Sequence, residues 1–133
     1  MTKFSRANKF NAKKSYRCLS CGAALPGKAA ACMHCGESRV HTFDSRAEGR
    51  RYDALRLKMK AGFISGLRVH PSYEIIINGE VVSKYIADFE YVIPGSGLVI
   101  EDVKSPATRT PEYRLKKKCV EALYKIRITE VMR

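Results

Sequence analysis

Two aspartates and a lysine interrupt the apolar pattern of the stretch from Ile86 to Lys104. β-Branched and aromatic residues on both sides of a Pro-Gly-Ser-Gly turn predict a β-hairpin there. If the loop runs from Ile93 to Gly97, the register places Asp88 opposite Asp102. Like charges directly opposite each other on a sheet repel, and a bound divalent cation would remove that repulsion. The hairpin is therefore a candidate metal-binding catalytic site.

The residue types define the chemistry of this candidate site. The carboxylates of Asp88 and Asp102 and the backbone carbonyl of Val103 are hard oxygen ligands, which suit Mg²⁺ or Mn²⁺. Side chains alternate between faces along a strand, so Lys104 shares the face of Asp102 whereas Glu101 points to the other face. A metal stabilises charge on a phosphate and lowers the pKa of bound water, and an ammonium group positions water or phosphate. The alternative is a surface Asp–Lys pair that contributes almost nothing.

A helix upstream of the hairpin is expected to carry a further carboxylate on its core-facing side. Ser45 and Glu48 have capping-box spacing, and Gly62 is a natural stop. Apolar residues recur at helical intervals between them: Tyr52, Leu55 and Met59. Glu48 falls on the same stripe, where a carboxylate is costly without a partner. Either Glu48 only caps its own helix, or it joins Asp88 and Asp102 at the metal.

The segment between this helix and the hairpin is expected to form strands. The run from Leu67 to Ile77 is strand-like and is interrupted by Pro71. Asn78-Gly79 is a strong hairpin turn signal, and Val81 begins a returning strand. His70 directly precedes the proline and is interpreted as a turn or sheet-edge residue, outside the site.

A second helix is expected near the C-terminal end. Thr110-Pro111 provides an N-cap followed by proline at the first helical position. The expected core-facing stripe is Leu115, Cys119, Ala122 and Ile126. Cys119 is interpreted as a small core residue rather than a zinc ligand, and Lys117 and Lys118 as a solvated face. Ile126 to Val131 is expected to close the sheet as a last strand.

The order and spacing of the acidic residues resemble the signature of the PD-(D/E)xK nucleases. Asp88 is followed by thirteen residues and then by Asp102-Val103-Lys104, and Ala87 stands where the signature has an often degenerate proline. The resemblance implies an α/β, restriction-endonuclease-like core with a mixed β-sheet flanked by helices. It also implies that Glu48 is an additional ligand, because a glutamate on the preceding helix recurs in this superfamily. The Asn78-Gly79 hairpin is a departure, since such a core does not require it.

The likeness is greatest to a family of small phage-encoded proteins of this superfamily. It covers Phe43 to Tyr124 and rests on four segments, namely Phe43 to Tyr52, Tyr85 to Tyr91, Val99 to Lys104 and Tyr113 to Lys116. The order of the acidic residues and the chain length also resemble archaeal-type Holliday-junction resolvases. Arg114 and Lys116 resemble the basic positions beside the scissile phosphate, which implies that they contact the DNA backbone.

Four cysteines predict a second, separate metal site. They form two Cys-x-x-Cys-Gly units, Cys18 with Cys21 and Cys32 with Cys35. Four thiolates suit tetrahedral zinc, and a site closed by four protein ligands is structural rather than catalytic. The glycine after each unit permits a tight turn that points backbone N–H groups at the sulfurs. The pattern resembles zinc ribbons, which often bind nucleic acid or form dimers.

The overall charge indicates a polyanionic partner. The chain has 133 residues, 25 Lys and Arg against 13 Asp and Glu, and a net charge of +12. Residues 1–17 contain six basic and no acidic residues, so we expect a basic arm in which Lys13, Lys14 and Arg17 contact DNA. There is no apolar run of signal-peptide or membrane-spanning length. A cytoplasmic protein without a membrane segment is expected.

The sequence therefore predicts three parts: a flexible basic arm (1–17), a zinc ribbon (18–41) and a nuclease core (42–133). The expected activity is Mg²⁺- or Mn²⁺-dependent hydrolysis of DNA phosphodiester bonds by a homodimer, with branched DNA such as Holliday junctions as the favoured target. One alternative is a zinc-ribbon protein that binds nucleic acid without catalysis. Another is an RNA-directed nuclease or ribosome-associated factor.

Overall fold

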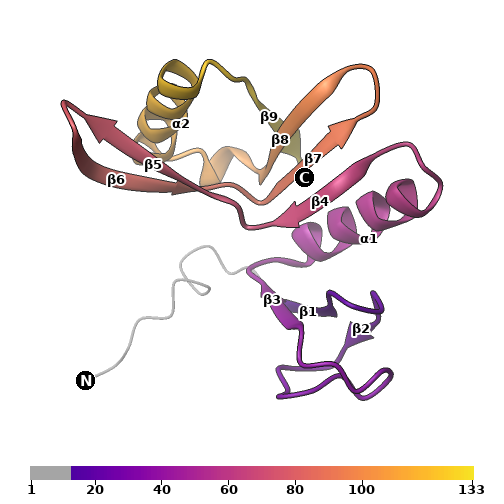
Figure 1. Cartoon of the computed structure of the whole chain (residues 1–133). Coiled ribbons are helices and arrows are strands. Elements are labelled where there is room, and N and C mark those ends of the chain that lie inside the picture. The colour runs from indigo at the N-terminus through magenta and orange to yellow at the C-terminus, as the bar shows by residue number, and fades with distance from the viewer. Residues whose placement is uncertain (1–12) are drawn as a thin grey trace, which may run out of the picture. The chain divides into compact units, whose positions relative to one another are not determined.

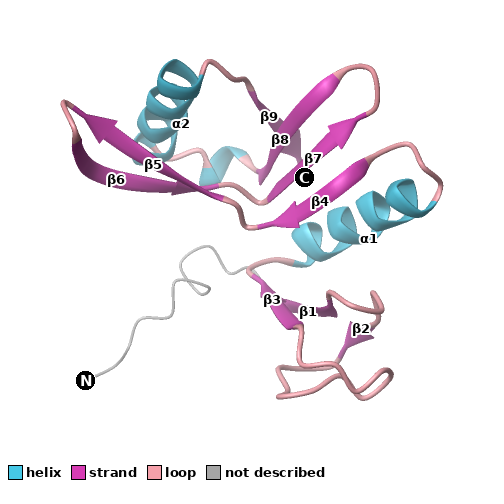
Figure 2. Ribbon diagram, in the orientation of Figure 1, coloured by secondary structure: helices cyan, strands magenta, loops and turns pink. Residues whose placement is uncertain are grey.

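The computed structural model describes residues 13–133 and is divided into two compact units. Unit 1 extends to Arg56 and unit 2 runs from Leu57 to Arg133, so the division falls inside helix α1, Arg46–Lys60. Both units contain strands, and the described residues form a mixed α/β structure (Figures 1 and 2). The α/β class expected from the sequence is thus confirmed.

Unit 1 contains a small antiparallel sheet built around strand β1, Ser15–Cys18. Strand β2, Ala24–Leu25, pairs with one edge of β1, and β3, Val40–Phe43, pairs with the other. Because β1 begins at Ser15, the last three residues of the stretch predicted as a flexible arm belong to a strand instead. Most of the predicted arm, residues 1–12, lies outside the described residues.

Helix α1 begins with the predicted capping box. The backbone N–H of Ser45 donates to the Glu48 carboxylate at 3.0 Å, and the N–H of Glu48 donates back to Ser45 Oγ at 3.1 Å. This reciprocal pair satisfies two donors that a helix start leaves open. The helix ends at Lys60, and Gly62 follows with a φ of +82°, a left-handed conformation that glycine adopts without strain.

Gly49 brings the first half of α1 against β1 within unit 1. A Cβ at this position would lie 2.4 Å from Ser15 Oγ and 3.2 Å from an Arg17 guanidinium nitrogen. Ser15 Oγ also donates to the backbone carbonyl of Ser45 at 2.8 Å. A glycine in a helix interior costs about 1 kcal/mol relative to alanine. Here its missing side chain permits the close approach of helix and strand.

The main sheet of unit 2 is mixed. Its strand order is β4-β7-β8-β9, with bounds β4 Ser65–Val69, β7 Phe89–Ile93, β8 Gly97–Lys104 and β9 Ile128–Met132. β4, β7 and β8 are antiparallel, whereas β9 pairs parallel with β8 (Figure 2). The hairpin from β7 to β8 has the predicted register, with Val92 opposite Leu98. The predicted last strand is confirmed and begins at Ile128.

Strands β5, Ser72–Ile77, and β6, Glu80–Ile86, form a separate two-stranded hairpin in unit 2. The strand predicted from Leu67 to Ile77 is therefore two strands, which separate at His70-Pro71. His70 has a φ of +52°, and Pro71 has no N–H to offer a neighbouring strand. The turn at Asn78-Gly79 is confirmed, and both residues have positive φ values, as a two-residue hairpin turn requires.

Helix α2, Pro111–Tyr124, begins as predicted, with Thr110 Oγ accepting from the N–H of Tyr113. The predicted core-facing stripe is confirmed in part, because Cys119 and Ile126 pack against the core, whereas Leu115 is 64% exposed and Ala122 is exposed as well. The fully buried residues of the helix are Tyr113 and Val120. The buried face is rotated because residues from distant strands, described below, hold Tyr113 and Lys117 inward.

The core of unit 2 lies between α2 and strands of both sheets. Its buried residues are Ile75, Tyr85, Ala87, Ile100, Tyr113, Val120 and Ile128. Cys119 packs against this cluster, as expected for a small core residue. No helix among the described residues has the length and apolar character needed to cross a membrane.

Candidate metal centres

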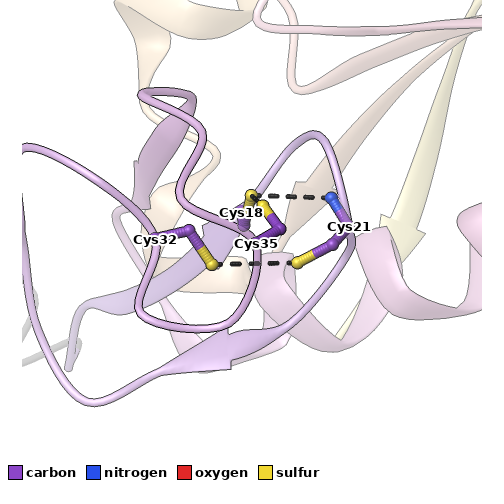
Figure 3. A group of neighbouring side chains, drawn as sticks. All are labelled: Cys18, Cys21, Cys32 and Cys35. Atoms are coloured by element: carbon purple, nitrogen blue, oxygen red, sulfur yellow. Dashed lines mark hydrogen bonds between the residues drawn. The ribbon is translucent and has the colours of Figure 1, made fainter.

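The four cysteines of unit 1 converge as predicted (Figure 3). Their sulfur atoms all lie within 4.8 Å of one another. Cys18 Sγ is 3.6 Å from Cys35 Sγ, and Cys21 Sγ is 3.8 Å from Cys32 Sγ. All four are free thiols rather than disulfides. Tetrahedral thiolate sites with metal–sulfur bonds near 2.3 Å require such spacing, so the cluster fits a structural zinc ion.

Each Cys-x-x-Cys-Gly unit folds as a tight turn that points N–H groups at sulfur. Gly22 has a φ of +82° and donates to the carbonyl of Cys18 at 2.8 Å. Gly36 has a φ of +79° and donates to the carbonyl of Cys32 at the same distance. The N–H of Cys21 donates to Cys18 Sγ at 3.5 Å (Figure 3). Because this bond favours the thiolate, it lowers the pKa of Cys18 to about 6.

The acidic residues of the β7–β8 hairpin are held by bonds between the strands. Asp88 directly precedes β7, and its carboxylate accepts from the backbone N–H of Val103 at 2.7 Å. Asp102 lies in β8, and its Oδ1 accepts from the backbone N–H of Asp88 at 3.1 Å. Both side chains are buried, with residue exposures of 9% and 2%. Each carboxylate is therefore anchored to the backbone of the opposite strand, and a metal ion shared by the two carboxylates stays a prediction.

Lys104 is positioned by an aromatic ring. Its Nζ lies 4.0 Å from the centroid of the Tyr113 ring, a cation–π contact between β8 and α2. The pKa of the Tyr113 hydroxyl is raised, first by burial and then by the negative charges of Asp102 and Glu130. Tyr113 thus contacts the ammonium group of Lys104 and lies within electrostatic reach of the Asp102 carboxylate.

Glu101 and Glu90 are two further buried carboxylates, and they lie on opposite faces of the sheet because Glu101 is paired with Phe89 and Glu90 with Ile100. Glu101 is 1% exposed and accepts a short hydrogen bond from the Tyr91 hydroxyl. Glu90 accepts from the Tyr73 hydroxyl and from Arg68, whose Nη1 is 2.9 Å away. Burial and the Glu90 carboxylate raise the pKa of Tyr73. The placement of Glu101 away from the Asp102 face agrees with the strand alternation.

His70 is a residue that the sequence interpretation excluded. Its backbone N–H donates to the carbonyl of Asp88 at 2.9 Å, and its Nε2 lies 3.9 Å from Asp88 Oδ1. Imidazole nitrogen is a common metal ligand, so His70 can contribute to a site at Asp88. The only feature of the sequence that could have indicated this role is the position of His70 directly before Pro71, a residue at which a strand ends.

Glu48 and Val103, which were predicted as metal ligands, each make a hydrogen bond within the protein. Glu48, in unit 1, accepts the capping hydrogen bond from Ser45. Val103 is buried in β8 and donates its N–H to Asp88. The capping interpretation of Glu48 is therefore confirmed, and a role as a metal ligand stays a prediction.

The residues predicted to contact DNA differ in their exposure and in their ion pairs. Lys13, Lys14 and Arg114 are exposed. Lys116 is paired with Glu112 at 3.1 Å on the surface of α2. Arg17 differs from the expectation of a free arm residue, because its guanidinium makes two hydrogen bonds of 2.8 and 2.9 Å to Asp53. That pair raises the pKa of Arg17 and gives its side chain a structural role in unit 1.

Lys117 is also not the solvated residue that the sequence suggested. Its Nζ lies 3.5 Å from the carboxylate of Glu130 in β9, and 22% of the side chain is exposed. Glu130 also accepts from Arg109 Nε at 2.8 Å and from the Tyr113 hydroxyl at 3.2 Å. This cluster joins α2 to β9 and turns the Tyr113–Lys117 face of the helix inward.

Comparison with known proteins identifies the family. A family model described as "Protein of unknown function (DUF1064)" matches residues 37–133. The chain belongs to this family. The DUF1064 match includes Glu48, Asp88, Asp102 and Lys104, and it begins after Cys35. The four-cysteine cluster therefore precedes the DUF1064 region of this chain. No curated protein and no solved structure matches the chain.

Proposed function

We propose that this DUF1064 protein is a divalent-metal-dependent endodeoxyribonuclease, with Asp88, Asp102 and Lys104 at its catalytic site. The observation that carries the proposal is the reciprocal anchoring of two buried aspartates across β7 and β8. Two carboxylates anchored across one hairpin repel each other when both are charged, and a bound cation would remove that repulsion. A hard oxygen pair of this kind suits Mg²⁺ or Mn²⁺.

Each residue of the proposed site has its own role in binding the metal or in positioning the phosphate and water. The Asp88 and Asp102 carboxylates would hold the metal, which when bound stabilises charge on a phosphate and activates water. The Lys104 ammonium group, steadied by the Tyr113 ring, binds the phosphate or orients the attacking water. The net charge of +12 favours association with DNA. This combination supports phosphodiester hydrolysis.

Two further elements of the proposal come from the resemblance to PD-(D/E)xK nucleases. Glu48 is proposed as an additional ligand. This role is tested by Glu48→Gln. Ser45→Ala is the control, because it removes the hydroxyl that accepts from the Glu48 N–H and keeps the Glu48 carboxylate. The carbonyl of Val103 and the backbone contacts of Arg114 and Lys116 are proposed on the same resemblance.

The proposed substrate is branched DNA, including four-way junctions, and the proposed active form is a homodimer. A core this small cuts two strands by pairing with a second copy. Sedimentation of the purified protein with and without a junction tests this form. A monomer that cuts both strands of a junction would contradict it.

The decisive experiment is a cleavage assay with zinc-loaded protein. Linear, flap and four-way-junction DNAs are incubated with Mg²⁺, with Mn²⁺ or without a divalent cation. We expect cleavage only with the metal, and loss of cleavage without loss of binding in Asp102→Asn. Glu74→Gln is the matched control, because Glu74 is an exposed carboxylate on β5. Unchanged cutting by Asp102→Asn would refute the site.

A second function is favoured by the four-cysteine cluster, which is the more completely formed of the two candidate metal centres. In this alternative the chain binds nucleic acid through unit 1 and has no catalytic activity. It predicts that DNA binding is independent of Mg²⁺ and that no substrate in the panel is cut. Adding RNA versions of the same substrates separates both functions from an RNA-directed nuclease.

A further inference from the structure

A basic hollow lies within unit 1, and none of the four cysteines lines it. It has a volume of about 310 Å³. It is lined by Lys14, Ser15, Tyr16, Arg17, Leu25, Pro26, Arg46 and Arg50. Four of these eight residues are cationic, and none is acidic. The hollow therefore has a local charge suited to an anion.

The four cations of the hollow differ in whether they are paired with an acidic residue. Arg17 is paired with Asp53, as described above. Lys14, Arg46 and Arg50 are exposed, and none of them takes part in an ion pair among residues 13–133. Three cationic groups at the rim are thus available to a ligand, while Arg17 is held as part of the wall.

The positions of Arg46 and Arg50 are unfavourable for the helix that carries them. Arg46 is the first residue of α1, where the positive end of the helix dipole disfavours a cation. Arg50 follows four residues later, and like charges at this spacing repel each other on a helix surface. Helix stability does not explain these two residues. An anionic ligand between them would remove both unfavourable terms.

Gly49 places these arginines beside β1. Because Gly49 lacks a side chain, α1 can approach Ser15 and Arg17 closely. This approach brings Arg46 and Arg50 to the same hollow as Lys14. The hydrogen bond from Ser15 to Ser45 fixes the same approach at the helix start. The hollow is therefore built by the packing of the helix on the strand.

We infer that this hollow binds the phosphodiester backbone of DNA through Lys14, Arg46 and Arg50. A backbone presents successive phosphates, which match cations on two elements, and the exposed rim admits a strand that continues beyond it. The inference deepens the proposed DNA-binding function and does not depend on cleavage. It assigns to unit 1 a backbone contact that is independent of Mg²⁺ and of base sequence.

Fluorescence anisotropy with a labelled DNA duplex and the corresponding single strand tests this site, without a divalent cation and across a salt series. The variant is Arg46→Gln/Arg50→Gln. The control is Lys58→Gln/Lys60→Gln, which removes the same charge from exposed positions in the last turn of the same helix. We expect the arginine variant to lose about tenfold in affinity near 0.1 M salt and its salt slope to fall by about 2.

The control variant should bind within about twofold of the unmodified protein. Zinc content and circular dichroism confirm that both variants are folded. Equal losses in the two variants would overturn the site, since net charge alone would then explain binding. Normal binding by the arginine variant would also overturn it.

The outcome is separable from that of the nuclease proposal. If Asp102→Asn still cuts DNA while Arg46→Gln/Arg50→Gln loses binding, the catalytic assignment fails and the backbone site stands. If Asp102→Asn abolishes cutting while the arginine variant binds normally, the backbone site fails alone.

Discussion

Asp102 Oδ1 accepts a hydrogen bond of 3.1 Å from the backbone N–H of Asp88, which joins the two acidic residues across the β7–β8 hairpin. A second bond of 2.7 Å, from the N–H of Val103 to the Asp88 carboxylate, runs in the opposite sense. A backbone donor stabilises each carboxylate as an anion. The hairpin thus anchors two buried acidic side chains across its strands, which a purely structural hairpin does not require.

The first prediction concerns metal binding independently of activity. Mg²⁺ or Mn²⁺ at a hundredfold excess over Kd should raise the Tm of the protein by about 10 °C, because a ligand that binds only the folded state then stabilises it by about 2.7 kcal/mol. Asp88→Asn and Asp102→Asn should show no such increase, since an amide keeps a hydrogen-bond acceptor but not the charge. Thermal unfolding followed by circular dichroism measures the shift.

The control for this prediction is Glu74→Gln, which leaves the hairpin untouched. In the absence of metal, the two asparagine variants should be at least as stable as the unmodified protein, because repulsion between the carboxylates is gone. An equal metal-induced increase of Tm in all three variants would mean that the cation binds elsewhere.

The local part of this site was accessible from the sequence. The β-branched residues around a Pro-Gly-Ser-Gly turn fixed the hairpin, and the period of 2 along a strand placed Asp102 and Glu101 on opposite faces. Capping and turn signals at Ser45, Thr110 and Asn78-Gly79 were equally local and were all confirmed.

What the sequence did not predict depends on contacts between distant residues. His70 was excluded because nothing near it in the chain indicates that its N–H meets the carbonyl of Asp88. The buried face of α2 was predicted only in part, because Leu115 extends an apolar stripe, whereas Glu130 and Lys104 hold Tyr113 inward. Periodicity is a weak guide where a helix buries polar side chains against partners on another strand.

The second prediction concerns the four-cysteine cluster. The purified protein should contain one zinc ion per chain, and Cys21→Ser or Cys35→Ser should lose it, because three thiolates do not close a structural site. Cys119→Ser should keep the metal, since Cys119 packs in the core of unit 2. Elemental analysis measures the stoichiometry. Because structural zinc contributes to folding, limited proteolysis of the zinc-free variants should cut within residues 13–43.

Two outcomes would contradict the zinc prediction. Loss of zinc from Cys119→Ser would show that the ligand set is different. Resistance of the Cys21→Ser unit to protease after metal loss would show that unit 1 folds without zinc.

The third prediction concerns the support of Lys104 by Tyr113. Tyr113→Leu removes the ring, and a cation–π contact of about 1 to 2 kcal/mol corresponds to a fall in kcat of about tenfold if Lys104 acts in the reaction. Tyr113→Phe keeps the ring and removes only the hydroxyl bonded to Glu130, so its kcat should change by less than about threefold. Single-turnover cleavage of a junction substrate measures both. Equal losses in the two variants would assign the effect to the hydroxyl or to folding.

The fourth prediction concerns the pH dependence of stability through Glu130. Burial alone would raise the pKa of this carboxyl, but the hydrogen bond from Arg109 and the charge of Lys117 outweigh it, so the pKa is lowered in the folded state. A carboxyl with a lowered folded-state pKa stabilises the protein above its unfolded pKa of about 4.5. That contribution decreases as pH falls toward the folded-state value.

Glu130→Gln should therefore reduce the free energy of unfolding by about 1 to 3 kcal/mol at neutral pH, because Arg109, Tyr113 and Lys117 lose a charged partner. The difference between the two proteins should be constant from pH 6 to 8 and shrink below about pH 4.5. Urea unfolding followed by circular dichroism at each pH measures it, with Glu112→Gln as a control, since Glu112 pairs with Lys116 at the surface. A difference that persists unchanged into acid would mean that Glu130 contributes through packing rather than charge.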